Sequence, residues 1–361
     1  MVKYLGLAGL AVLYALLFGE VFLRVMAPQP LMPRYVVGTG WGIRGNQPGI
    51  TYRQWTPETE VMLTINSQGM RDTREHPYEA PPGTCRIALL GDSYFMGYEA
   101  RLEETIAGEL EAAFERRGYD LDVLNFAVSG HGTSEMILQF ENLARHFSPD
   151  ITVFQFHGSD YDDNIRANLH RLAPDGTLVA TGRTYLPAVG IRNTLEAIPA
   201  YRWMSEHSQI YAGLRENAAA FVKVLLARIS LRTSAAETGE QGVDPVEEDV
   251  ASRLTATLIA EARRITLAAG SDWYMFDVPT RRSRTEFASL LGRMDLPPEV
   301  LARTVSVLPA FEAHAGPDTK LYYEKGHLHF TPLGNRLAAE ALFELIRQDS
   351  AGILAKCKGA P

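Results

Sequence analysis

One short stretch, residues 87–97, narrows the choice of folds more than any other part of the chain. It reads Ile-Ala-Leu-Leu-Gly-Asp-Ser-Tyr-Phe-Met-Gly. The four leading apolar residues are typical of a strand that is covered on both faces. Gly91 permits a sharp turn, and Asp92 or Ser93 can cap a following helix. The stretch therefore predicts a buried strand, a tight turn and the start of a helix, with Ser93 at the carboxyl end of the strand.

Ser93 would then occupy a position that suits a nucleophile. Open α/β sheets place their sites at the carboxyl ends of parallel strands. A helix N-terminus adds N–H groups and a partial positive charge at the same place. Both favour a reaction that develops an oxyanion. An ordinary strand-to-helix turn has the same local sequence, so the interpretation depends on the rest of the chain.

Apolar runs and amphipathic segments alternate along the chain. Strands are expected at residues 61–65, 86–90, 121–128, 151–156 and 273–278. Helices are expected at residues 103–117, 135–147 and 250–269, and from Pro332 to about residue 347. Repeated strand–helix units predict a parallel, doubly wound α/β sheet.

The N-terminus carries a long apolar run. Residues 4–23 are interrupted only by Glu20, and about 20 helical residues cover the roughly 30 Å hydrocarbon core of a bilayer. Residues 18–22 lack a small-x-small cleavage site, so an uncleaved signal anchor is favoured over a cleaved signal peptide. We expect residues 1–26 to be a single-pass anchor in a bacterial inner membrane, with the globular part in the periplasm or extracellular space.

Composition divides the remainder of the chain. Residues 27–50 are rich in proline and glycine, which indicates an extended linker. Residues 233–248 are polar and acidic, as in a mobile loop. The expected boundaries are a linker at 27–60, an α/β domain at 61–350 with an insertion at about 165–249, and a tail at 351–361.

Charge and cysteine content bear on partners and cofactors. The 43 acidic and 35 basic residues give a formal net charge of −8 at pH 7, which gives no reason to expect a nucleic-acid partner. The two cysteines, Cys85 and Cys357, form no Cys-x-x-Cys pair. A disulfide in an exported domain and two free thiols both remain open. His327 and His329 have no acid cluster with ligand spacing beside them, so we expect no metal and no cofactor.

Three turns follow consecutive expected strands, around Ser93, Gly130 and Ser159. His329 stands far downstream, just before the last helix. Imidazole can take the proton of an attacking hydroxyl because its pKa lies near neutrality. The N–H groups of Ser93 and Gly130 are candidates for two oxyanion donors. This combination predicts acyl transfer by a serine.

Four blocks of the chain resemble the SGNH or GDSL hydrolase family over about residues 60–350. The blocks are Gly91-Asp92-Ser93, Val128-Ser129-Gly130-His131-Gly132, residues 149–164, and His329 five residues before Gly334. Residues 66–72 and the N-terminal apolar run resemble a membrane-anchored bacterial branch of that family. The serine α/β-hydrolases match less well, because Phe95 occupies the last glycine of their Gly-x-Ser-x-Gly elbow.

The resemblance implies a three-layer α/β/α sandwich with a flavodoxin-like parallel sheet. It also implies roles for particular residues. Ser93 would be the nucleophile and His329 the general base and acid. The oxyanion would be held by Ser93, Gly130 and Ser159, although the family usually has an asparagine where this chain has Ser159.

The acid of the family's triad has no counterpart at the usual place. The family has an aspartate two or three residues before the histidine, where this chain has His327 and Gly326. We expect a carboxylate from elsewhere, Glu324 first and Asp160 second, to orient the imidazole instead.

Four further residues are candidates for substrate binding: Asp92, His131, His157 and Arg71. The first three belong to strand-end turns and would line a cleft there. Arg71 is explained equally well as a salt-bridge partner.

Two functions remain in competition. The first is an envelope-anchored serine ester hydrolase or O-acyltransferase that acts on an acylated glycan or lipid. The second is a degenerate, non-catalytic domain of the same fold, which binds a glycan or is a structural subunit beside a membrane-protein partner. Ser93 and His329 favour the first function, and the missing asparagine and aspartate favour the second.

Overall fold

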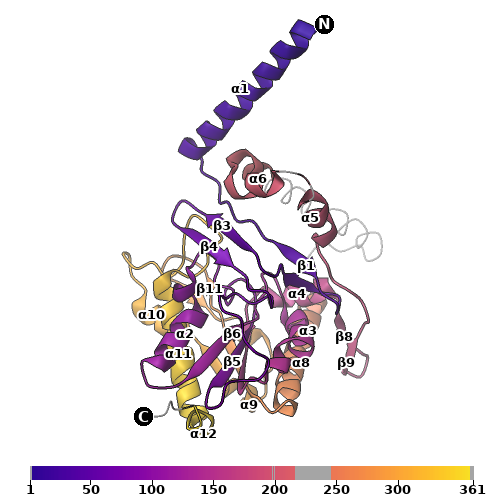
Figure 1. The fold of residues 1–361 in the computed structure, drawn as a ribbon. Helices are drawn as coiled ribbons and strands as arrows, with labels where there is room; N and C mark the ends of the chain where they lie inside the picture. Colours follow the sequence, from indigo (N-terminus) through magenta and orange to yellow (C-terminus); the bar gives the residue numbers. More distant parts are fainter. Residues whose placement is uncertain (1, 197, 199, 216–244, 358–361) are drawn as a thin grey trace.

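The domain is built around a five-stranded parallel sheet (Figure 1). The computed structural model describes residues 2–196, 198, 200–215 and 245–357. The strands are β5 (Cys85–Leu90), β6 (Leu121–Asn125), β7 (Ile151–Phe156), β10 (Asp272–Asp277) and β13 (Thr304–Ser306). Their spatial order is β13-β10-β7-β5-β6, and every neighbouring pair is parallel. This is the flavodoxin-like order, so the expected doubly wound fold is confirmed.

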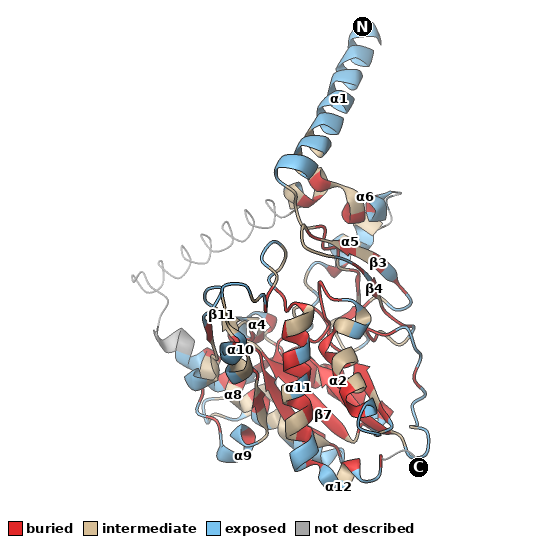
Figure 2. Cartoon of the chain, turned by 90° about the vertical axis from the view of Figure 1, so that its left-hand side faces the viewer, coloured by how far each residue is buried: buried red, intermediate tan, exposed pale blue. Residues whose placement is uncertain are grey.

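Helices cover both faces of the sheet. One face carries α2 (Ile106–Glu115), α10 (Leu308–His314) and α11 (Pro332–Asp349). The other carries α3 (Thr133–Asn142) and α8 (Pro245–Ala268). Ile87 and Leu89 of β5 belong to the first core, and Ala88 and Leu90 belong to the second, because successive side chains of a strand point to opposite faces. The three layers enclose a buried sheet (Figure 2).

Short elements complete the layers. Two of them are strands that pair antiparallel, β11 (Thr280–Arg281) and β12 (Phe287–Ala288). The short helices are η1 (Leu102–Glu104), η2 (Ala144–Phe147), η3 (Leu291–Arg293), α9 (Pro298–Leu301) and α12 (Ala351–Leu354).

The N-terminal apolar run forms one helix, α1 (Val2–Met26), that projects from the domain (Figure 1). Its span Lys3–Met26 has a mean hydropathy of 2.0 and no part of its most apolar window is buried. By length and composition this helix can cross a membrane. Near the C-terminal end of α1, the carboxylate of Glu20 accepts hydrogen bonds from the backbone N–H groups of Gln209 and Ile210, at 2.9 and 3.1 Å. These bonds join that end of the helix to the domain.

Residues 27–60 are not the extended linker that the proline and glycine content predicts. They form two antiparallel hairpins, β1 (Val36–Gly38) with β2 (Arg44–Asn46), and β3 (Thr51–Trp55) with β4 (Glu60–Thr64). Tyr35 and Tyr52 from this segment are buried in the first core. Prolines and glycines shorten the strands here, but the apolar residues between them still pack on the domain.

The described part of the insertion contains a hairpin and helices. These are α4 (Asp160–Ala167), β8 (His170–Leu172) paired with β9 (Leu178–Ala180), α5 (Val189–Glu196) and α6 (Tyr201–His207). Most of the loop expected at residues 233–248 lies outside the described residues.

The C-terminal segment is part of the core and not a free tail. Leu354 and Cys357 are buried. Cys357 forms a disulfide with Cys85 at the start of β5, with the two Cα atoms 5.3 Å apart. Of the two alternatives that the sequence leaves open, the structure has the disulfide.

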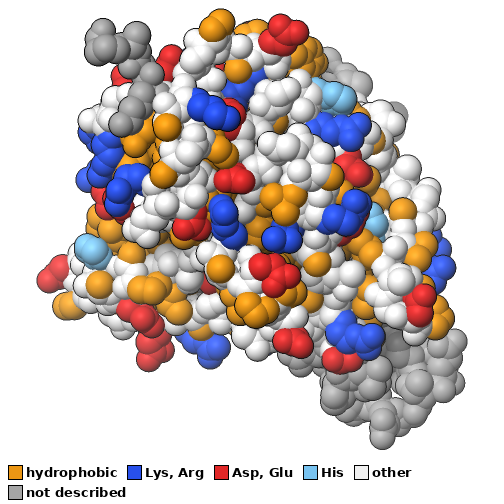
Figure 3. All heavy atoms as spheres, turned by 90° about the horizontal axis from the view of Figure 1, so that it is seen from below, with side chains coloured by type: hydrophobic (Ala, Val, Ile, Leu, Met, Phe, Trp, Pro, Cys, Tyr) orange, Lys and Arg blue, Asp and Glu red, His pale blue; other side chains and the backbone are white. Residues whose placement is uncertain are grey.

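Charges of both signs are interspersed on the face of the domain opposite α1 (Figure 3). Acidic and basic side chains alternate over the described part of that face, with small apolar areas between them. Such a mixed surface is ordinary for a globular domain.

Candidate active site

A cavity of about 370 Å³ opens at the carboxyl ends of β5, β6 and β7. The sheet order reverses between β5 and β7, and such switch points are where doubly wound folds bind ligands. The cavity is lined by Ser93 and Asp92 after β5, Gly130 after β6, His157 and Ser159 after β7, and His329 before α11, together with Arg34, Tyr94, Ser129, Asp163, Gly326, His327 and Leu328. The structure thus brings together most of the site residues that the sequence predicts.

The turn that carries Ser93 is held from beneath by Gln155 of β7. Gln155 Oε1 accepts the N–H groups of Asp92 and Phe95 at 3.3 and 3.1 Å. A Cβ on Gly91 would lie 2.6 Å from this oxygen, so only glycine fits at that position. Asp92 Oδ1 accepts the N–H of Tyr94 at 2.8 Å, which makes the carboxylate of Asp92 part of the turn as well as of the cavity wall.

Ser93 and His329 lie within hydrogen-bond reach of each other. His329 Nε2 is 2.8 Å from Ser93 Oγ, in the range that a nucleophile and its base require. The imidazole is 5% exposed, and the rings of Tyr94 and Tyr98 flank it with centroids 5.1 and 5.4 Å away. These contacts limit the rotation of the ring.

The carboxylate that faces His329 belongs to Glu99, which the sequence did not reveal. Glu99 Oε2 lies 2.9 Å from His329 Nδ1 and also accepts the backbone N–H groups of His327 and His329 at 3.1 and 3.3 Å. Because an ionised carboxylate only accepts, Nδ1 carries the proton and Nε2 is free to accept from Ser93. The arrangement is that of a serine, histidine and acid triad.

Glu99 occupies an unusual backbone conformation in a fully buried site. Its φ is 63° and its relative exposure is 0%. Non-glycine residues adopt positive φ at a cost of order 1–3 kcal/mol, so the surrounding structure must hold this one in place. A Cβ on Gly326 would lie 1.6 Å from Glu99 Oε1, which explains a glycine where the family has its acid.

Neither acid that the sequence favoured reaches His329. Glu324 Oε1 instead lies 3.3 Å from Arg281 Nη2 and 3.5 Å from Arg284 Nε, toward the surface. Asp160 is fully buried at the start of α4, where it accepts from Thr133 Oγ1 at 3.0 Å. Burial raises the pKa of Asp160 well above its ordinary value. A carboxylate from elsewhere in the chain does face His329, as expected, but it belongs to Glu99. The prediction that this carboxylate would come from Glu324 or Asp160 was wrong.

Arg71 supports the loop that carries Glu99 and does not line the cleft. Its guanidinium donates to the carbonyl oxygens of Met96, Gly97 and Ala100, the last at 2.9 Å. It is 1% exposed, and burial lowers its pKa to about 10. The prediction that Arg71 contacts substrate is therefore wrong. Arg71 instead stabilises the loop of residues 96–100.

Two backbone N–H groups, those of Ser93 and Gly130, are candidates for an oxyanion site. Within the part of the chain that the structure describes, no protein acceptor takes the N–H of Ser93 or of Gly130. Gly130 has φ 80°, and Arg44 Nη2 donates to its carbonyl oxygen at 2.7 Å. Arg44, from the N-terminal segment, thus helps to fix the orientation of the turn at Gly130.

Ser159 and His157 form a pair at the third strand end. Ser159 Oγ lies 2.9 Å from His157 Nδ1, and the Ser159 N–H also points to that nitrogen, at 3.4 Å. An N–H can only donate, so Nδ1 accepts and the neutral ring carries its proton on Nε2. Burial lowers the pKa of His157, which favours this neutral form.

His131 is buried beneath the site and does not line the cavity. Its Nε2 lies 2.9 Å from the carbonyl oxygen of Arg44. Burial lowers the pKa of His131 to about 3, so the ring is neutral and Nε2 donates. The prediction that His131 binds substrate is therefore wrong. Its hydrogen bond instead helps to hold Arg44 beside Gly130.

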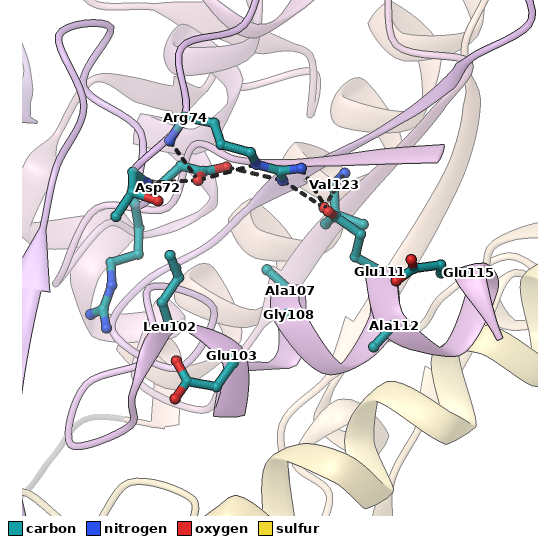
Figure 4. A pocket seen from close by; sticks show the side chains of 12 residues that line it. Asp72, Arg74, Leu102, Glu103, Ala107, Gly108, Glu111, Ala112, Glu115 and Val123 are labelled. Carbon is teal, nitrogen blue, oxygen red and sulfur yellow. Dashed lines mark hydrogen bonds and ion pairs between the residues drawn. The ribbon is translucent and has the colours of Figure 1, made fainter. Parts of the chain in front are cut away.

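A separate cavity lies between residues 71–74 and α2 (Figure 4). Three of its charged side chains, Asp72, Arg74 and Glu111, are paired with one another. Arg74 Nη2 lies 3.3 Å from Asp72 Oδ2 and 2.8 Å from Glu111 Oε2. Since it shares no lining residue with the cavity at Ser93, it does not extend that site.

The described residues contain no group of three or more His, Cys, Asp or Glu side chains that could hold a metal ion. His327 and His329 stack with ring centroids 6.3 Å apart, and both nitrogens of His329 already have protein partners.

Comparison with known proteins gives distant structural neighbours. No protein-family model matches the chain, and no curated protein matches it. GDSL and lipolytic hydrolases are among the solved structures that resemble it. A lipase/acylhydrolase from Enterococcus faecalis is 14% identical, with a TM-score of 0.32, over 76% of this chain and 100% of that one.

Two further neighbours are as remote. A GDSL-like lipase from Bacteroides thetaiotaomicron is 13% identical, with a TM-score of 0.32, over 74% of this chain and 89% of that one. A two-domain esterase active on acetylated mannans is 11% identical, with a TM-score of 0.37, over 73% of this chain and 49% of that one. Values of this size decide neither fold nor function.

Proposed function

We propose that this protein is a serine-dependent ester hydrolase or O-acyltransferase of the SGNH type. The observation that carries the proposal is the chain of contacts from Ser93 Oγ to His329 Nε2 at 2.8 Å and from His329 Nδ1 to Glu99 Oε2 at 2.9 Å. The degenerate, non-catalytic alternative was favoured by a missing asparagine and a missing aspartate; Glu99 supports an answer to the second, because its carboxylate lies beside His329 Nδ1, whereas Ser159 still stands at the asparagine position. The hydrolase or transferase is therefore the better supported function.

The reaction would begin with attack of Ser93 Oγ on the carbonyl carbon of an ester. His329 Nε2 takes the hydroxyl proton, and the imidazolium that forms is stabilised by Glu99. The bond to the alcohol oxygen then breaks, and the leaving alcohol takes the proton from Nε2. An acyl group stays on Ser93. Water or an acceptor alcohol attacks this acyl-enzyme with His329 as base, which gives hydrolysis or transfer, and Ser93 Oγ regains its proton.

The tetrahedral intermediate needs donors aimed at its oxyanion. The free N–H groups of Ser93 and Gly130 are two candidates. We assign the third to Nε2–H of His157, because Ser159 already uses its hydroxyl on the opposite nitrogen of this ring. Ser159 would then act by orienting His157, in the place where the family has an asparagine.

The position of α1 supports a membrane-associated substrate or acceptor. Figure 1 shows α1 leaving the end of the domain opposite α9 and α12. α11 runs from the cleft at its N-terminal end toward α12, so the cleft lies at the α1 end. With α1 as an anchor in a bacterial inner membrane and the domain in the periplasm, the natural substrate would be an acylated glycan or lipid, and a membrane-protein partner could supply the acyl group.

The test is covalent labelling of the full-length protein in detergent with a fluorophosphonate probe. We expect wild-type protein to be labelled and Ser93→Ala to be unlabelled, since the probe reacts with an activated serine. Ser129→Ala, which alters another serine of the same cavity, is the matched control and should retain the signal. Absence of labelling in folded wild-type protein would favour the non-catalytic alternative.

A further inference from the structure

A second cavity of about 370 Å³ adjoins the cleft at Ser93. Arg34 and His327 line both of them. The walls of this second cavity, here called the arginine pocket, come from residues 32–35 of the N-terminal segment and residues 188–215 of the insertion. Both segments lie outside the parallel sheet and its helices, so the pocket is an addition to the core fold.

Three arginines line the arginine pocket: Arg34, Arg192 and Arg215. Arg192 donates to the backbone carbonyl of Arg34, which holds the two side chains near each other. The guanidinium of Arg34 lies 5.8 Å from the ring centroid of Tyr98. In the described parts of the chain, neither Arg34 nor Arg192 has a carboxylate within ion-pair distance.

No acid in the described segments forms an ion pair with Arg34 or Arg192. Glu206 is engaged by Arg202 at 2.9 Å and by the hydroxyl of Tyr35 at 3.1 Å. Glu196 interacts electrostatically with Arg192 without forming an ion pair, and burial raises the pKa of Glu196. Burial and the neighbouring Arg34 lower the pKa of Arg192. Among the described residues, Arg34 and Arg192 are adjacent, partly buried cations that form no ion pair, and such a pair gains from a bound anion.

We propose that the arginine pocket binds a carboxylate or phosphate group of an anionic acylated glycan whose ester lies at Ser93. The proposal rests on the proposed function and names the substrate class of that same site. Arg34 stands between the two cavities, so one molecule can place its ester beside Ser93 and an anionic group beside Arg34 and Arg192.

The remaining lining of the pocket fits a sugar better than a lipid chain. It includes the apolar side chains of Met32, Ile191 and Leu195 and the hydroxyl-bearing residues Tyr201, Ser205 and Tyr211. A sugar ring has an apolar face and a polar rim, and aromatic residues that carry a hydroxyl group suit both. A lipid chain would instead require a continuous apolar groove.

The experiment compares two substrates that differ only in charge, using the full-length protein in detergent. One is an O-acetylated oligosaccharide of carboxylated sugars, and the other is the same oligosaccharide after reduction of its carboxyl groups. We expect wild-type kcat/KM to be at least about tenfold higher for the anionic form, the effect of one charge-assisted contact. Arg192→Gln should lower this ratio toward one, chiefly through KM. Arg183→Gln, an exposed arginine of the same insertion, should keep it.

Each of the following outcomes either supports or refutes the proposal. Equal turnover of the two oligosaccharides by wild type, or an unchanged ratio in Arg192→Gln, would overturn the proposal. A higher rate with an anionic phospholipid ester than with either oligosaccharide would replace the glycan by a lipid and also overturn it. If no ester is turned over and no fluorophosphonate label is found, the proposed function fails. Calorimetric binding of the anionic oligosaccharide in preference to its reduced form, lost in Arg192→Gln, would still support the pocket, and equal binding would refute it.

Discussion

Glu99 Oε2 lies 2.9 Å from His329 Nδ1, although the two residues are 230 positions apart in the chain. The same oxygen accepts the backbone N–H groups of His327 and His329. One buried carboxylate thus fixes both the tautomer of the imidazole and the loop that presents it. Loss of this contact is expected to affect the reactivity of Ser93 more than the stability of the sheet, because Glu99 lies outside the strands.

The first prediction concerns Glu99→Gln. The amide keeps the shape of the side chain but stabilises the imidazolium less, and its NH₂ can force the wrong tautomer on His329. We expect the rate of fluorophosphonate labelling to fall by about 10²–10⁴. Glu324→Gln is the control, since Glu324 pairs with Arg281 at the surface, and it should be labelled like wild type. Equal labelling of Glu99→Gln and wild type would remove Glu99 from the triad.

The second prediction separates His157 from Ser159. His157→Phe keeps an aromatic ring of similar size and removes Nε2–H, so the turnover of an acetyl ester should fall by about 10²–10³ in kcat. Ser159→Ala removes only the group that orients the ring, so its loss should be smaller. A larger loss in Ser159→Ala than in His157→Phe would identify the hydroxyl of Ser159 as the oxyanion donor instead.

Local sequence predicted the parts of the site that depend on a strand followed by a turn. Ser93, Gly130 and Ser159 each lie in the turn that follows a largely buried strand, and His329 precedes a recognisable helix start. Glu99 has no such local signal, because its contact with His329 is long-range and its positive φ is set by the surrounding loop. A single charged residue within the apolar residues 94–100 was the one available clue, since isolated charges are rarely buried without a partner.

The same limit explains the errors in the fold. β13 has three residues, too few for an apolar run to stand out. Residues 27–60 were predicted to be a linker because proline and glycine usually indicate loops, whereas Tyr35 and Tyr52 pack edge to face with centroids 4.9 Å apart. Only the domain beneath them makes these hairpins stable, and short sequence windows do not contain that information.

The third prediction concerns the disulfide between Cys85 and Cys357, which closes a loop with a sequence separation of 272. Cross-linking so long a loop restricts the unfolded chain, and removing a native disulfide typically costs about 2–5 kcal/mol. We expect Cys357→Ser to lower the thermal midpoint of the protein. Dithiothreitol should lower it in wild type and leave the variant unchanged. Mass spectrometry of the isolated protein that finds both thiols free would contradict the bridge.

The fourth prediction uses His76, which lies 2.9 Å from Asp72 Oδ2 and 3.8 Å from Asp122 Oδ2. Burial alone would lower the pKa of His76, but Asp122 and Asp72 outweigh it and raise the pKa to about 9. A pKa raised from about 6.5 in the unfolded chain means that the folded state binds the proton more tightly. The stabilisation is therefore fully present below pH 6.5 and lost as pH rises through 9.

His76→Gln should accordingly lower the thermal midpoint most near pH 6, with a difference from wild type that shrinks between pH 6.5 and 9. His146→Gln, at an exposed position, is the control and should change the midpoint little at any pH. A penalty for His76→Gln that stays constant across this range would show that packing and not the charge of His76 stabilises the fold.

The fifth prediction concerns α1. Large apolar side chains along this helix are exposed, among them Leu7 at 68% and Leu10 at 65%, and a soluble domain rarely leaves such a surface in water. We expect the full-length chain to remain with the membrane after alkaline extraction and to be released when residues 2–26 are deleted. Replacing Leu10 and Leu13 by lysine should release it as well, because each lysine near the middle of a span costs about 2.5–3.5 kcal/mol.

Protease added to spheroplasts should digest the domain if it lies outside the cytoplasm. Recovery of the intact wild-type chain in the soluble fraction would refute the membrane anchor, and protection from the protease would place the domain on the other side.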